Sequence, residues 1–244
     1  MTQPASVAEP HVKPLDSRFV WRVFFAFGAL AMLSLAISIG GKWVGKSIVL
    51  AGHTDDQTPR EIVIGNNVIV APSNAIRFER DRRDAVMDRL DLYLHWPDMK
   101  GYSAGLRDDF NNIGGRRSII FLSIENQVMS RDMSGRFEPI YRLLIEPTGT
   151  QGPSGLGFYK FTQKSGYMNE MLAVAARPGG DPFVARCLTG PSAEESLAPC
   201  ERDIFVGDGL SLTYRFSSDL LKDWKMLDQA VNGQARKMIR SGKS

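Results

Sequence analysis

The pattern of apolar and polar positions divides the chain into one long apolar run and a larger block of short alternating segments. The run extends from Val23 to Gly41 (VFFAFGALAMLSLAISIGG), and its nineteen residues include no charged side chain and no proline. As a helix it would be about 28 Å long, which matches a bilayer core roughly 30 Å thick. Because the run is apolar on every side, it is not typical of a buried core helix. We therefore predict a single N-terminal transmembrane helix over residues 19–41.

Tryptophan and basic residues flank the run, as they do at membrane interfaces. The predicted flanks are Arg18, Trp21, Arg22, Lys42, Trp43 and Lys46. A cleaved signal peptide is the alternative, because small residues at Ser34, Ala36 and Ser38 form acceptable cleavage sites. The 22 residues before the run are long for the N-terminal region of a signal peptide, and the apolar run continues past the first site, which favours an uncleaved anchor. The basic flanks are nearly balanced, with a slight bias towards a cytoplasmic tail.

Short β-like segments separated by turns follow from residue 61 onwards. The segment 90–96 (LDLYLHW) alternates apolar and polar side chains, which predicts a strand with one buried face. Gly65-Asn66-Asn67 and Gly207-Asp208-Gly209 each lie between β-like runs and predict two hairpins. Further strands are predicted at 117–126, 137–147, 157–163, 171–177 and 182–188.

Two helices are predicted within this block. The charged segment 78–90 contains no Gly or Pro, which favours a short helix. A clearer helix begins after Ser217 or Ser218, either of which is a suitable N-cap. It carries one apolar stripe, formed by Leu220, Leu221, Trp224, Leu227 and Val231. We therefore expect an α+β domain: a mainly antiparallel sheet or sandwich with a C-terminal amphipathic helix, preceded by the transmembrane helix.

The predicted organisation has four parts. They are a disordered cytoplasmic tail (1–18), the transmembrane helix (19–41), a connector (42–60) and a periplasmic β-rich domain (61–244). The chain of 244 residues has a formal net charge of +3, which provides no concentrated basic face for nucleic acid.

The two cysteines of the chain, Cys187 and Cys200, enclose a polar, turn-rich segment. A disulfide between them would close a loop of about 14 residues, for which the chain-entropy model gives ~3 kcal/mol. Two unrelated thiols are the alternative. The spacing is too long for a CxxC redox pair, and no zinc-type cluster accompanies it. Together with the predicted anchor, a structural disulfide places the domain in an oxidising compartment such as the bacterial periplasm.

Few residues suggest catalysis. Asp91, Tyr93 and His95 share the polar face of one predicted strand and are the first candidates for acid–base chemistry. The adjacent pairs Asp108-Asp109 and Glu194-Glu195 are typical of solvated surface, because glycosidase chemistry needs carboxyls that face each other across a bond. Phosphate-loop, dinucleotide-binding, zinc-protease and serine-hydrolase motifs are absent from the sequence. We predict no cofactor and no metal.

The sequence thus predicts a non-enzymatic binding or assembly module of the bacterial cell envelope. It would be held in the inner membrane by a single pass, with its main domain in the periplasm and a protein as its partner. A tethered immunity protein against a periplasmic toxin is one alternative, and an envelope hydrolase with a dispersed active site is another. A signalling receptor is disfavoured because the short N-terminal tail has no room for an output domain.

Overall fold

The computed structural model describes residues 17–50 and 52–241, and within the first helix it describes the side chains of 18 and 21–37 only. The chain divides into two compact units between Ala51 and Gly52. Helix α1 (Ser17–Leu50) belongs to the first unit and includes the predicted apolar run. No helix within the described residues is long and apolar enough to cross a membrane. The predicted flanks Lys42, Trp43 and Lys46 and most of the predicted tail lie outside the described side chains.

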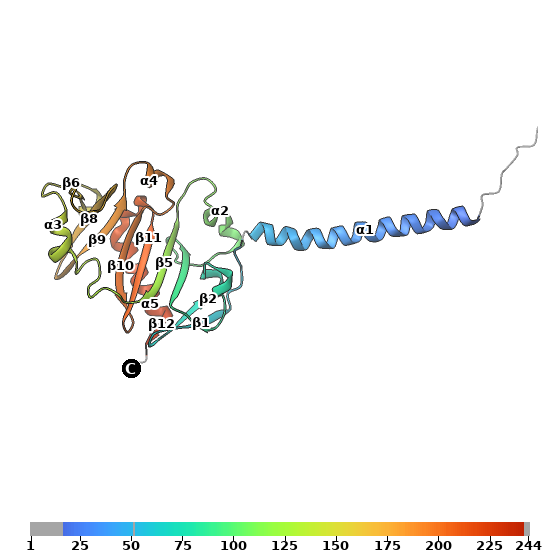
Figure 1. Ribbon diagram of the computed structural model, residues 1–244, viewed down its shortest axis with the longest axis horizontal. Helices are drawn as coiled ribbons and strands as arrows, with labels where there is room; N and C mark the ends of the chain where they lie inside the picture. The colour runs from blue at the N-terminus through green and yellow to red at the C-terminus, as the bar shows by residue number, and fades with distance from the viewer. Residues whose placement is uncertain (1–16, 51, 242–244) are drawn as a thin grey trace, which may run out of the picture. The chain divides into compact units, whose positions relative to one another are not determined.

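The second unit contains an eight-stranded, wholly antiparallel sheet, as expected for an α+β domain (Figure 1). Its strands, in spatial order, are β4 (Arg89–His95), β5 (Ile119–Asn126), β11 (Leu210–Phe216), β10 (Cys200–Val206), β9 (Gly180–Leu188), β8 (Glu170–Arg177), β7 (Gly157–Lys160) and β6 (Thr150–Gln151). The predicted hairpin at Gly207–Gly209 joins β10 to β11.

A second, four-stranded sheet contains the other predicted hairpin. Its order is β12 (Ile239–Ser241), β2 (Asn67–Pro72), β1 (Pro59–Ile64) and β3 (Ala85–Val86). β1 and β2 are antiparallel, whereas β1 and β3 are parallel. The predicted C-terminal helix is also present: a helical turn η6 (Ser218–Asp223) leads into α5 (Trp224–Met238). Of the two predicted N-caps, Ser217 is the one used, because its hydroxyl accepts a hydrogen bond from the Asp219 amide.

The main core lies between one face of the large sheet, the small sheet and α5. The apolar stripe of α5 supplies Trp224, Leu227 and Val231 to this core. The alternating residues Leu90, Leu92 and Leu94 of β4 enter it from the large sheet and are almost fully buried. Because side chains alternate along a strand, the polar residues between these leucines lie on the opposite face of the sheet.

A smaller core covers the opposite face, but only over β8 and β9. There Leu172 and Val184 pack against Met133, Tyr141 and Ile145 from the segment between β5 and β6. The smaller core does not extend over the other half of this face, over β4, β5, β11 and β10, although at the end of β4 Tyr93 is buried beside His53 and Phe110. We call this half the open face.

Two predicted elements are wrong. The segment 137–147 is helical rather than extended, with the turn η4 (Phe137–Tyr141) followed by α3 (Arg142–Leu144). Pro139 cannot donate a ladder hydrogen bond within a strand, and as a helical turn the segment packs Tyr141 into the smaller core. The predicted helix at 78–90 is a single turn η2 (Glu79–Asp81) followed by β3 and the start of β4. Its second half is extended because Ala85 and Val86 pair with β1, and Arg89 and Leu90 pair with β5.

Candidate functional site

The open face carries the polar residues of four strands, arranged in rows by the strand register. One row runs through Tyr93, Phe121, Arg215 and Glu201 on these four strands and continues to Arg186 on β9. The next row contains Asp91, Ser123 and Thr213. Residues that are far apart in the sequence therefore become direct neighbours across the sheet.

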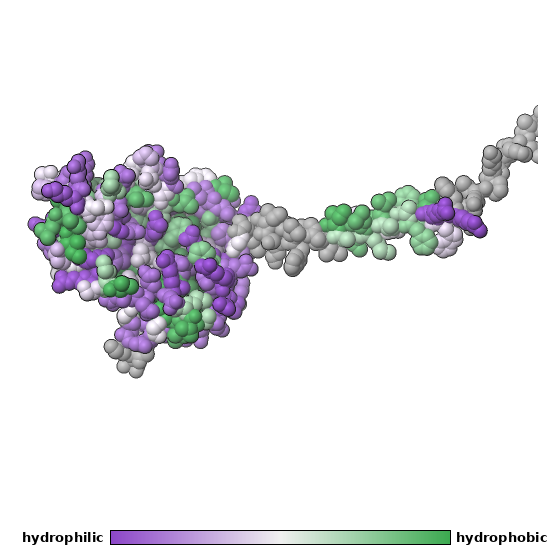
Figure 2. Space-filling view, viewed as in Figure 1, coloured by the Kyte–Doolittle hydropathy of each residue, from purple (hydrophilic) through white to green (hydrophobic). Residues whose placement is uncertain are grey.

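A groove of about 390 Å³ lies on the open face. We call it the open-face groove. Its floor is formed by β4, β5 and β11. The floor residues are Asp91 on β4, Phe121, Ser123 and Glu125 on β5, and Thr213 and Arg215 on β11. Arg77 lines one side and the segment Ser196–Ala198 lines the other. On the face of the domain shown in Figure 2, hydrophilic residues predominate and apolar residues form only small patches.

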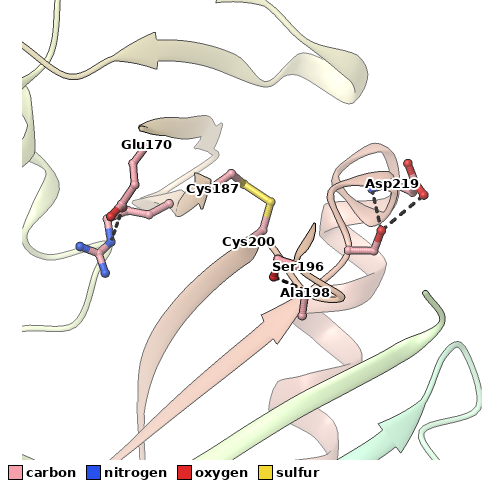
Figure 3. Close-up of a disulfide and its surroundings, with 8 residues drawn as sticks. Glu170, Cys187, Ser196, Ala198, Cys200 and Asp219 are labelled. Carbon is pink, nitrogen blue, oxygen red and sulfur yellow. Dashed lines mark hydrogen bonds and ion pairs between the residues drawn. A yellow bond between two sulfur atoms is a disulfide. The ribbon is translucent and has the colours of Figure 1, made fainter. Parts of the chain in front are cut away.

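The disulfide Cys187–Cys200 fixes the wall formed by Ser196–Ala198. It joins the neighbouring strands β9 and β10, and Ser196 and Ala198 lie in the segment next to Cys200 (Figure 3). The loop that it closes is also fastened to the start of β5, because the Arg117 guanidinium donates a 2.6 Å hydrogen bond to the Glu194 carbonyl. The wall presents Leu197, whose side chain is exposed, at the groove. The predicted disulfide is therefore present and borders the site.

Charges in the groove are distributed unequally. At one end, Arg89 is shared by two carboxylates: it lies 2.9 Å from Asp91 and 3.9 Å from Glu125. Hydrogen bonds to Asp91 raise the pKa of the Arg89 guanidinium. The Ser123 hydroxyl also donates a hydrogen bond to Asp91. Both carboxylates at this end thus already have a cationic partner.

The other end of the groove is cationic. Glu201 lies opposite Arg215 in the strand register, yet its carboxylate pairs with Arg186 on the far side. Arg186 is also 3.5 Å from Glu170. Among the described residues, Arg215 forms no ion pair, and neither does Arg77. The Arg77 guanidinium instead stacks over the Phe121 ring, 5.0 Å from its centroid.

The predicted catalytic candidates lie on one face of β4 but have separate partners. Asp91 belongs to the groove, with Arg89 and Ser123. Tyr93 forms a 3.1 Å hydrogen bond with the Nδ1 atom of His53. Tyr93 is largely buried, and the loss of solvation raises the pKa of its hydroxyl. The structure does not bring the three side chains together around one reacting atom.

His95 lies between two carboxylates. Its Nδ1 atom is 2.9 Å from Asp98 and its Nε2 atom is 3.2 Å from Asp109. Arg116 lies 3.6 Å from the other oxygen of Asp109. Both ring nitrogens are therefore occupied, and no serine, threonine or cysteine among the described residues forms a hydrogen bond with either. This arrangement orients the ring but offers no nitrogen to a nucleophile. Within the described residues, no group of three or more His, Cys, Asp or Glu is arranged to hold a metal.

Sequence reasoning did not identify Arg77, Phe121 and Arg215 as members of one site. Each lies in a different segment, and only the strand register brings them together. The sequence signal that could have indicated this face is the alternation along β4, β5 and β11, in which exposed or half-buried residues alternate with buried apolar residues.

Comparisons with known proteins give a distant likeness only. No protein-family model matches the chain, and no curated protein sequence matches it. An immunity protein of the type IV secretion system of Stenotrophomonas maltophilia is similar over 78% of this chain and 96% of its own, at 16% identity and a TM-score of 0.48. The iron-regulated outer membrane lipoprotein FrpD of Neisseria meningitidis is similar over 76% of this chain and 94% of its own, at 9% identity and a TM-score of 0.44. Functional argument therefore rests on the residues of this chain.

Proposed function

We propose that the chain is a non-enzymatic binding module, held at a membrane by α1, whose open-face groove is the docking site for a protein. The observation that carries the proposal is the groove itself. It combines unpaired arginines, the aromatic Phe121 and the exposed Leu197 on a wall that a disulfide fixes. Arginine and aromatic side chains are the types that most often dominate protein–protein binding energy.

The chemistry of the groove suits a protein surface better than a small apolar ligand. Small-molecule sites are mostly apolar and enclosed, with few polar groups. This groove is lined by three arginines and three carboxylates, Asp91, Glu125 and Glu201, and lies on a broad sheet face. Protein interfaces of standard size cover ~800 Å² per partner, with a polar rim around a smaller anchor. The groove would act as such an anchor.

The predicted span 19–41 is described only in part, and the apolar character of its described residues supports the membrane part of the proposal. Its described apolar side chains are exposed within their own unit, including Phe24, Phe27, Leu33 and Ile37. Successive helical residues are rotated by about 100°, so these side chains point to different sides. An isolated helix that exposes apolar groups on every side is stable in lipid rather than in water. The uncharged sequence from Val23 to Gly41 is consistent with this role.

The proposed location is the inner membrane, with the β domain in the periplasm. The disulfide supports it, because such bonds persist in oxidising compartments. A reporter enzyme that is active only outside the cytoplasm, fused after Ser244, should be active in intact cells. An inactive fusion that is nevertheless present in the membrane fraction would overturn this orientation.

A matched pair of variants tests the binding function. Leu197 on the groove wall and Met226 on α5 are both exposed apolar residues, 45% and 57% accessible. In Leu197→Glu, a partner that docks in the groove should be lost when full-length chain is purified from solubilised membranes. Met226→Glu should retain the same partner at wild-type yield. Equal recovery with both variants, or equal loss, would contradict docking in the groove.

The growth conditions under which the partner is recovered distinguish an assembly module from a tethered immunity protein. An assembly module should recover its partner from cells grown alone, because that partner is a component of the same envelope. A tethered immunity protein should recover it only after exposure to a competitor that delivers a toxin. A catalytic role is tested apart from both: if His95→Asn leaves the cellular phenotype intact, the hydrolase alternative loses its best-placed side chain.

A further inference from the structure

We propose that the cationic end of the groove, formed by Arg77, Phe121 and Arg215, receives a carboxylate from an acidic segment of the partner protein. This inference rests on the proposed function and specifies the chemistry of the partner. Arg215 projects from β11 directly opposite Phe121 on β5. Arg77 lies over the same ring, with its guanidinium carbon 5.0 Å from the ring centroid. The two guanidinium groups therefore line one end of one groove.

Neighbouring carboxylates among the described residues form no ion pair with Arg77 or Arg215. Glu201 is the direct cross-strand neighbour of Arg215, but its hydrogen bond and ion pair are formed with Arg186. Asp91 and Glu125 share Arg89 at the other end of the groove. A cation whose neighbouring anions are already paired remains available to a charge on another molecule.

Stacking prepares Arg77 for this role. A guanidinium that lies over an aromatic ring keeps its N–H groups free at the edge while its flat face loses contact with water. Arg77 stacks over both Phe121 and Phe78, with its carbon 5.0 and 5.1 Å from the two ring centroids. The edge of a planar guanidinium matches a carboxylate, which can accept two parallel hydrogen bonds.

Charge complementarity selects an acidic protein segment as the occupant. A basic segment would meet Arg77 and Arg215, which form no ion pair among the described residues and would repel it. Leu197 and Ala198 on the wall and Phe121 on the floor provide apolar contact beside the charges. The expected segment therefore carries an Asp or Glu next to an apolar residue.

A peptide titration tests the inference without knowledge of the partner. The probes are three rhodamine-labelled peptides of equal length, in which leucine alternates with glutamate, with glutamine or with lysine. Their fluorescence anisotropy is measured against the full-length chain in a neutral detergent. The glutamate peptide should bind roughly tenfold more tightly than the glutamine peptide at low salt, and the lysine peptide least tightly. Its affinity should fall as salt is raised, because exposed charges are screened beyond about 8 Å at physiological ionic strength.

Variants locate the binding. Arg215→Gln and Arg77→Gln should each weaken binding of the glutamate peptide by about fivefold, the effect of one exposed charge pair. Lys237→Gln removes an exposed cation from α5 and should have no effect. Equal affinity for the three peptides, or equal loss with Lys237→Gln, would overturn the inference. If Leu197→Glu abolishes recovery of the natural partner while Arg215→Gln does not weaken the glutamate peptide, the proposed function stands and only the carboxylate inference fails.

Discussion

A single carboxylate, Asp228, joins the C-terminal helix to the large sheet. It lies 3.0 Å from Arg202 on β10 and 2.7 Å from Arg177 on β8, and the Tyr214 hydroxyl donates a 3.0 Å hydrogen bond to it. Arg202 is only 1% exposed, although it is one of the largest side chains of the domain. Its guanidinium also donates hydrogen bonds to the Ser134 hydroxyl and the Val184 carbonyl. The network satisfies a buried charge, which would otherwise be strongly unfavourable.

Asp228→Asn should therefore be strongly destabilising. The substitution leaves Arg202 buried without a counter-charge, and the loss of one partner from a buried pair costs about 3–5 kcal/mol. Denaturant unfolding monitored by tryptophan fluorescence would measure the difference. Asp181→Asn, which changes an exposed carboxylate on β9, should stay within ~0.5 kcal/mol of the parent. Similar stabilities for the two variants would contradict the importance assigned to the network.

His53 couples the stability of the domain to pH. Its ring stacks on Tyr102, with 4.6 Å between centroids, and burial lowers the pKa of its imidazole. The nearby Arg82 charge lowers it further, against the opposing hydrogen bond to Asn111. Below its ordinary pKa of 6.5, His53 takes up a proton more readily in the unfolded chain. Its contribution to stability is thus complete above that pH and is lost as the pH falls.

We expect His53→Gln to reduce the loss of stability between pH 7.5 and pH 5.5. The measurement is the difference in unfolding free energy between the parent and the variant at each pH, so that contributions from other titrating groups cancel. The difference should shrink as the pH is lowered. A difference that is constant across this range would show that burial of the imidazole does not favour its neutral form.

At the scale of elements, turns fix how the two sheets meet. Asn67 at the start of β2 accepts a 2.8 Å hydrogen bond from the Asp208 amide and donates one of the same length to the Asp208 carbonyl. The β1–β2 hairpin is thereby bound to the β10–β11 turn. Gly207 and Gly209 in that turn have φ angles of +56° and +68°, a region that favours glycine.

Alanine substitutions at these two glycines should differ. At Gly209 an added Cβ meets no atom within 4 Å, so only the backbone conformation is penalised, by about 1–2 kcal/mol. At Gly207 the Cβ would approach the Asn67 Oδ1 atom to 2.5 Å, which breaks the contact between the hairpins as well. Thermal unfolding should therefore show a larger decrease in Tm for Gly207→Ala. A larger effect at Gly209 would contradict this view of the junction.

The disulfide stabilises both the domain and the wall of the groove. Replacement of Cys187 and Cys200 by alanine should cost about 3 kcal/mol, because the unfolded chain regains the freedom of the closed loop. Amide hydrogen exchange should rise in 189–199, and the rise should exceed that in α5. Unchanged exchange in this segment would show that the Arg117–Glu194 hydrogen bond alone holds the wall.

The elements that could be predicted from the sequence are those in which the spacing of apolar residues fits either a strand or a helix, but not both. The alternation in β4 and the apolar stripe of α5 each match a single period, and both elements are present. The segment 137–147 mixes apolar and polar residues in a way that fits either period, and its contact with the smaller core favours the helical turn. β12 was missed because its three residues directly follow a long helix and are extended by pairing with β2.

At the scale of the whole molecule, the large sheet has two different faces. One is buried under α5 and the small sheet, and the other is covered by the smaller core over β8 and β9 and carries the open face over β4, β5, β11 and β10. The sequence predicts the buried face by alternation, but it does not predict which polar residues meet on the other. That information depends on the order of strands, which places β11 beside β5 despite their distance in the chain.

Site-specific photo-crosslinking in intact cells tests the central claim most directly, namely that the open-face groove is the surface on which a protein docks. A photoreactive phenylalanine would replace Thr213 or Leu197 in the groove, and Met226 or Lys237 on α5, in the full-length chain. We predict an adduct with one defined protein from both groove positions and none from the α5 positions. Adducts from the α5 positions alone, or groove positions that yield no adduct in the presence of the partner, would contradict the account.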